Sequence, residues 1–191
     1  MESKKIEFTR IMGGIGWPGQ RPGFVVVVGM EKFPKIGTNN YNIHVLDEAE
    51  DVDLKALFKH ADRFMTKYNF EDFFCRYDRA FTNLADEFSL HRKPFFYSAP
   101  FSENGDISYH IRTLKGLLDK GDKSLHLSKT SNLPGHLQEI SLFGDTMPDL
   151  KYPAVAALGY AVTGLRFLGP LDDEDNEDYP DDDDIDDTTG Y

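Results

Sequence analysis

The stretch that decides the fold covers residues 10–30 and reads RIMGGIGWPGQRPGFVVVVGM. Four consecutive valines at 25–28 leave no polar face, so they predict a β-strand buried on both faces of a sheet. The glycine-rich stretch 13–16 before Trp17 allows a sharp bend or the close approach of another segment. We therefore predict two strands, joined by the loop 18–22, on which the rest of the chain packs.

The N-terminal third of the chain has the alternation and turn residues of a β-meander. Strands are predicted at residues 5–15, 23–30 and 41–46, with a turn at 35–40 that contains Gly37, Asn39 and Asn40. Because the connections are short, the three strands should run antiparallel. An acidic cluster that contains Asp47 and Glu48 is expected directly after the third strand.

The hydrophobic period changes to that of helices after residue 50. Asp51 and Asp53 can cap a helix whose apolar residues between Leu54 and Tyr68 recur at i, i+3, i+4 and i+7. Further helices are predicted around residues 81–88, between Asp106 and Gly121, at 134–143 and at 154–167. Short extended segments are predicted at 73–77, 95–97 and 125–127.

This order of elements predicts an α/β fold with a mixed sheet. Three antiparallel strands are followed by strands alternating with helices, which gives parallel pairings and helices on both faces. The 40% hydrophobic content is enough for a substantial core. Because no internal repeat and no linker precede Gly169, we expect one domain over residues 1–170.

The net charge of −12 is concentrated in residues 171–191. That segment holds 12 of the 33 acidic residues and no lysine or arginine, which leaves 21 acids against 21 bases in the rest of the chain. A segment of this composition repels itself and cannot bury itself, so we predict an acidic, disordered tail. It is either a solubilising tail or an electrostatic mimic of nucleic acid that binds a basic partner.

Several classes of protein are disfavoured by the sequence. It has no apolar run of about 18 residues and no apolar segment typical of a signal peptide near Met1. The single cysteine, Cys75, cannot form an internal disulfide, and without an adjacent histidine it is a poor nucleophile. The six histidines lack the spacing of a zinc site, and no P-loop motif is present, so neither zinc nor a nucleotide is expected.

Five stretches together resemble the C-terminal nuclease domain of phage terminase large subunits, over residues 6–167. They read GGIGWPGQRPGFVVVVG, YNIHVLDEAE, CRYD, LLDKGDKSLHLSKTSNLPGHLQEI and YPAVAALGYAVTGL. The resemblance implies a ribonuclease H-like fold and a viral protein of the host cytoplasm that takes part in DNA packaging. It also implies phosphodiester hydrolysis by two Mg²⁺ or Mn²⁺ ions held by carboxylates.

The family's acidic site is degenerate in this chain. The first acid of the family, at the end of the first strand, corresponds to Gly16, and the second corresponds to Asp78. The third, at the start of the last helix, corresponds to Tyr152 and Pro153, with Asp149 a few residues earlier. Two of the three metal-binding acids are therefore absent.

Other residues could compensate for these losses. Asp47 and Glu48 could supply substitute carboxylates beside Asp78, and Asp145 or Asp149 could act as a displaced third acid. The alternative for Asp78 is a helix cap, and for the others an ordinary polar loop. Arg76 and Arg79 flank Asp78 and are candidates for contacting DNA phosphates.

The expected function is that of a phage DNA-packaging protein whose metal-dependent DNA cleavage is lost or weakened. If active, it is a Mg²⁺- or Mn²⁺-dependent DNA endonuclease with a site built on Asp78 and, less directly, Asp149. DNA, a separate ATPase subunit and other packaging proteins are the partners that the resemblance implies. The alternative is a non-catalytic interaction module that binds a basic protein through its acidic tail.

Overall fold

The computed structural model describes residues 6–31, 42–79, 83, 91–92, 94–99, 106–118, 125–128, 130–138 and 148–168. In this part of the chain a six-stranded sheet has the order β5-β4-β1-β2-β3-β6. Its strands are β1 (Phe8–Gly16), β2 (Gly23–Glu31), β3 (Ile43–Asp51), β4 (Asp72–Cys75), β5 (Phe95–Ser98) and β6 (Leu125–His126). β1, β2 and β3 pair antiparallel, whereas β4, β5 and β6 make parallel pairs, which confirms the predicted mixed sheet.

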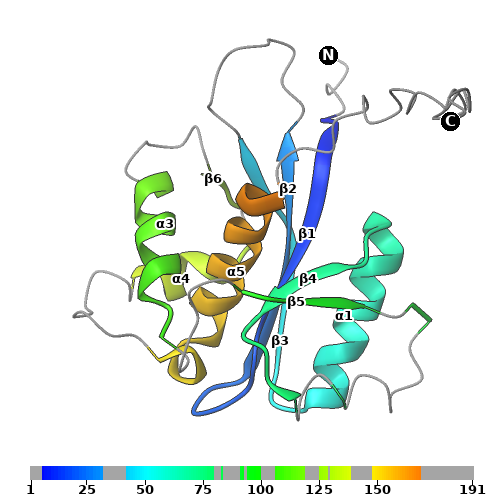
Figure 1. The fold of residues 1–191 in the computed structure, drawn as a ribbon, viewed down its shortest axis with the longest axis vertical. Coiled ribbons are helices and arrows are strands. Elements are labelled where there is room, and N and C mark those ends of the chain that lie inside the picture. Colours follow the sequence, from blue (N-terminus) through cyan, green and yellow to red (C-terminus); the bar gives the residue numbers. More distant parts are fainter. Residues whose placement is uncertain are drawn as a thin grey trace, which may run out of the picture.

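Helices cover both faces of the sheet, as Figure 1 shows. α1 (Leu54–Tyr68) lies on one face, and α3 (Ser108–Leu118), α4 (Leu133–Gln138) and α5 (Pro153–Leu168) lie on the other. Val25 and Val27 pack in the core under α1, while Val26 and Val28 pack in the core under α5. All four valines are completely buried, which confirms the prediction made from the four-valine run.

The glycines of β1 allow α5 to lie directly against the strand. A Cβ atom on Gly14 would stand 2.0 Å from the carbonyl oxygen of Ala157, far inside van der Waals contact. Small residues on both elements thus let the backbone of the helix approach the backbone of the strand. This contact positions the first turn of α5 at the C-terminal end of β1.

Helix ends form where the sequence places capping residues. The Asp53 side chain accepts a hydrogen bond from the backbone N–H of Lys55 and caps α1, as predicted. Asp106 accepts hydrogen bonds from the N–H and the hydroxyl of Ser108 at 2.9 and 2.6 Å, at the start of α3. α1 ends at Tyr68, and its C-cap residue Asn69 has the left-handed φ of 54° common at helix C-termini.

β3 is longer than the sequence predicts and includes Asp47 and Glu48. Backbone pairing with β2 continues to the end of the strand, where Gly23 is opposite Asp51. β6 pairs only with Ile43 and His44, so the remainder of β3 is an edge of the sheet in the part of the chain described. The acidic side chains there remain partly exposed, which explains why a strand accommodates them.

Several predicted features lie outside the described residues. They are the turn at 35–40, most of the helix at 81–88, Gly121, the second half of the helix at 134–143, and the acidic segment 171–191. The boundary between a domain ending at residue 170 and a tail therefore stays a prediction. Among the helices described, none has the length and apolar character needed to cross a membrane.

Candidate functional site

The C-terminal ends of β1 and β4 meet at one edge of the sheet, where ligands bind in many α/β proteins. The two strands are parallel neighbours, with Ile15 opposite Cys75, so the segments that follow them emerge side by side. The start of α5 lies against the same edge, because Pro153 packs on Gly16. The fold thus brings together the segments that resemble the family's three acidic positions.

Gly16 has no room for a side chain. A Cβ atom there would stand 1.9 Å from the carbonyl oxygen of Pro153 and 2.7 Å from its Cα. These are backbone atoms of the first turn of α5, and they cannot swing aside like the end of a flexible side chain. The position predicted to correspond to the family's first acid therefore has no carboxylate and no space for one.

The guanidinium group of Arg76 lies between the carboxylates of Asp78 and Asp149 at this edge of the sheet. Arg76 donates through Nη1 to Asp149 Oδ1 at 2.8 Å, and its Nη2 lies 3.8 Å from Asp78 Oδ2. The backbone oxygen of Arg76 accepts a 2.8 Å hydrogen bond from Trp17 Nε1, which ties the end of β4 to the end of β1. Asp78 and Asp149, both predicted as site residues, are thus brought together, with an arginine between them.

Asp149 is buried and fully engaged with donors. Its side chain is 2% exposed, and besides Arg76 it accepts hydrogen bonds from the Leu150 N–H at 2.7 Å and the Tyr160 hydroxyl at 3.3 Å. Burial raises the pKa of Asp149, while the positive charge of Arg76 acts in the opposite direction. Burial and the neighbouring charge of Asp149 also raise the pKa of Tyr160.

The structure does not bring Asp47 and Glu48 to Asp78. Asp47 accepts a hydrogen bond from Lys67 Nζ at 2.8 Å on the face covered by α1. Glu48 lies on the opposite face, where it accepts hydrogen bonds from the hydroxyl of Ser131 and the N–H of Asn132 near the start of α4. Successive side chains of a strand point to opposite faces, so these neighbours cannot both serve one site.

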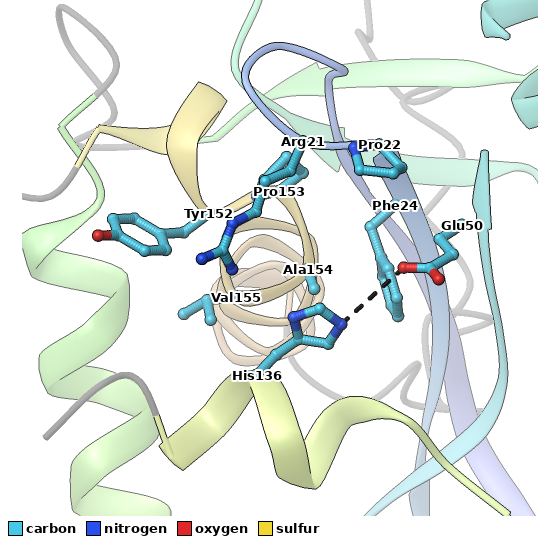
Figure 2. Close-up of a pocket in the computed structure, with 9 residues that line it drawn as sticks. All are labelled: Arg21, Pro22, Phe24, Glu50, His136, Tyr152, Pro153, Ala154 and Val155. Carbon is cyan, nitrogen blue, oxygen red and sulfur yellow. Dashed lines mark ion pairs between the residues drawn. The ribbon is translucent and has the colours of Figure 1, made fainter. Parts of the chain in front are cut away.

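Tyr152 lines a small cavity beside the start of α5 (Figure 2). Arg21 and Lys151 lie over its ring, with cation–centroid distances of 5.3 and 5.4 Å. His136 projects into the same cavity and pairs with Glu50 at 4.0 Å. The cavity volume is about 30 Å³, room for about one water molecule, so it does not resemble a substrate cleft.

The two arginines proposed to contact DNA differ in their surroundings. The charge of Arg76 is shared between Asp149 and Asp78, so it is poorly placed to attract a phosphate. Arg79 is exposed and close in sequence to the same edge. Asp145, the alternative third acid, lies outside the described residues.

The residues at this edge do not fit a pair of divalent cations. Two such ions need several carboxylates around them, yet Gly16 supplies none and Asp149 is occupied by three donors. Within the described ranges, no group of three or more histidine, cysteine, aspartate or glutamate side chains could hold a metal ion. Cys75 is buried in β4, and burial raises the pKa of its thiol, which makes it unreactive.

The ion pair between Arg76 and Asp149 was missed by the sequence analysis. The two residues are 73 positions apart, and Asp149 reaches the site because the short 3₁₀ helix Asp149–Lys151 precedes α5. The signal available in the sequence was an arginine two residues before Asp78, a predicted site residue.

Comparisons with known proteins support the fold. No protein-family model matches the chain, and no curated protein matches it in sequence. The crystal structure of the large-terminase nuclease domain from the bacteriophage SPP1, with bound Mn, is similar with a TM-score of 0.54 and 16% sequence identity. The match covers 85% of this chain and 89% of that one. The chain therefore has the ribonuclease H-like α/β fold of a phage large-terminase nuclease domain.

Proposed function

We propose that this chain is a component of a phage DNA-packaging machine that keeps the terminase nuclease fold but does not cut DNA. The observation that carries this proposal is the packing of Pro153 on Gly16, 1.9 Å from where a Cβ would stand. The resemblance to terminase nuclease domains implies a metal-binding carboxylate at that position. Here the start of α5 occupies the space that such a side chain requires.

The remaining acids support the same reading. Asp78 is the one carboxylate that matches a family position, and it faces Arg76. A single carboxylate does not hold two hydrated Mg²⁺ ions, which give up their water reluctantly. The domain would then act by binding within the packaging machinery of the host cytoplasm. It would supply no ATPase activity itself, since residues 1–191 contain no P-loop motif.

A second candidate function follows from the 12 acidic residues after Leu171, which are unaccompanied by lysine or arginine. Such a segment attracts a basic protein surface, including one that otherwise binds DNA. In this version the domain is an interaction module, and the acidic segment supplies the contact. Loss of partner binding at about 0.5 M salt, where charges are strongly screened, or after deletion of residues 172–191 would support it.

The test is a plasmid-nicking assay on the full chain in Mn²⁺ and in Mg²⁺, with chelator as the blank. The SPP1 large-terminase nuclease domain serves as the positive control. We expect no conversion of supercoiled plasmid above the blank. Metal-dependent nicking that disappears in Asp78→Asn would overturn the proposal and would establish an active site built on that carboxylate.

DNA binding is measured on the same preparation by fluorescence anisotropy. We expect weak, salt-sensitive binding, because the chain outside residues 171–191 has as many acids as bases. Arg79→Ala should weaken it uniformly across DNA sequences, as expected for a contact to the phosphate backbone.

A further inference from the structure

The carboxylates at the end of β4 are joined by a cation that belongs to the chain itself. Arg76 Nη1 lies 2.8 Å from Asp149 and Nη2 lies 3.8 Å from Asp78, so one guanidinium serves two carboxylates from distant segments. We propose that Arg76 is a built-in substitute for a divalent cation, and that its removal opens a one-metal site between Asp78 and Asp149. The inference deepens the proposed loss of cleavage and rests on it.

Hydrogen bonds from neighbouring residues hold both the Arg76 segment and the Asp149 carboxylate in place. Trp17 Nε1 donates to the backbone oxygen of Arg76 at 2.8 Å, which fixes the segment that carries the guanidinium. Leu150 and Tyr160 donate to Asp149 at 2.7 and 3.3 Å, which fixes the carboxylate. The Arg76 side chain is 20% exposed and that of Asp149 is 2% exposed, so the pair is largely withdrawn from water.

A carboxylate this buried requires a positive partner or a proton. Arginine meets that requirement permanently, because it does not lose its proton in proteins. A metal ion meets it only while bound. With arginine in place of a metal ion, the stability of the junction of β1, β4 and α5 does not depend on divalent cations.

The same charge keeps a divalent cation out. An ion between Asp78 and Asp149 would stand within a few ångströms of the Arg76 guanidinium, where like charges repel strongly at low dielectric. Without Arg76, two carboxylates and water would face the vacated space. Mn²⁺ and Mg²⁺ are commonly bound by one or two carboxylates that leave several waters on the ion.

The experiment compares the thermal stability of full-length wild type, Arg76→Ala and Arg76→Gln with chelator and with millimolar MnCl₂. Any weak binding of Mn²⁺ by the acidic segment is shared by all three chains and cancels in the comparison. We expect the wild-type melting temperature to be unchanged by Mn²⁺. In both Arg76 variants it should rise by about 3–6 °C when Mn²⁺ is at roughly ten times its Kd.

Two matched variants identify the ligands. Arg112→Ala removes an exposed arginine of α3 and should behave like wild type. Adding Asp149→Asn to Arg76→Ala should abolish the Mn²⁺ response, because one of the two ligands is lost. If Arg76→Ala is insoluble with chelator but folds in Mn²⁺, the inference is supported.

The inference is overturned if neither Arg76 variant responds to Mn²⁺, or if both remain insoluble in Mn²⁺. It is also overturned if the response survives in the double variant. Because the readout is stability, its outcome is separate from that of the nicking assay. Cleavage by wild type would refute the proposed function, whereas a metal-indifferent Arg76→Ala chain would refute this inference alone.

Discussion

The substitution Gly16→Ala tests the close contact on which the functional proposal depends. The added methyl carbon would stand 1.9 Å from the Pro153 carbonyl oxygen, whereas ordinary contact begins at 3.4 Å. The start of α5 must therefore retreat by about 1.5 Å, since backbone atoms cannot rotate away. The backbone of Gly16 is not left-handed, so the effect comes from the lost space alone.

Overpacking of this kind costs typically about 1–3 kcal/mol, and contact with backbone favours the upper half of that range. We expect a loss of about 2–3 kcal/mol in the free energy of unfolding. In a chain of this size that corresponds to a melting temperature lower by roughly 4–12 °C. The measurement is urea unfolding followed by circular dichroism, with linear extrapolation to water.

Gly116→Ala is the matched control. A Cβ on Gly116, within α3, meets nothing within 4 Å, so the substitution should stabilise the chain by about 0.5–1 kcal/mol through helix propensity. Gly16→Asp should destabilise more than Gly16→Ala and should not confer nicking. The reasoning fails if Gly16→Ala is as stable as wild type, or if Gly16→Asp cuts DNA in Mn²⁺.

Three further predictions concern charge. Asp149→Asn should lower the free energy of unfolding by about 3 kcal/mol, because it leaves a largely buried guanidinium short of a partner. Asp78→Asn should lower it by under about 1 kcal/mol, because its pair with Arg76 is 3.8 Å long and partly exposed. Urea unfolding of both variants measures this difference. Burial acts to raise the pKa of Asp62, but the hydrogen bonds from His91 and from the Arg92 N–H outweigh it and lower that pKa. The stability that Asp62 contributes is therefore present above about pH 4, its pKa in the unfolded chain, and is lost as the pH falls through the lower pKa of the folded chain. In an acid titration, the difference in unfolding free energy between wild type and Asp62→Asn should shrink. A difference that stays constant would contradict this. Deletion of residues 172–191 should leave the melting temperature within about 2 °C of wild type, because a segment of such composition buries little apolar surface. A larger drop in melting temperature would show that this segment packs on the domain.

The sequence by itself predicted the architecture through local rules. Four consecutive β-branched residues define β2, helical spacing after Asp53 defines α1, and Pro153 followed by small residues defines α5. These features depend on backbone preference, capping and the side-chain period, and each acts within a few residues. The same rules underestimated β3, because the pairing that extends it comes from β2.

Only the tertiary structure decided what the site contains. The sequence showed that Gly16 lacks a carboxylate, but the 1.9 Å approach of Pro153 depends on how closely α5 docks on β1. It offered Asp47 and Glu48 as replacements, and the strand directs them to opposite faces. The pairing of Arg76 with Asp149, across 73 residues, results from tertiary packing. A buried carboxylate needs a positive partner, and the packing of β4 against the start of α5 brings Arg76 to it.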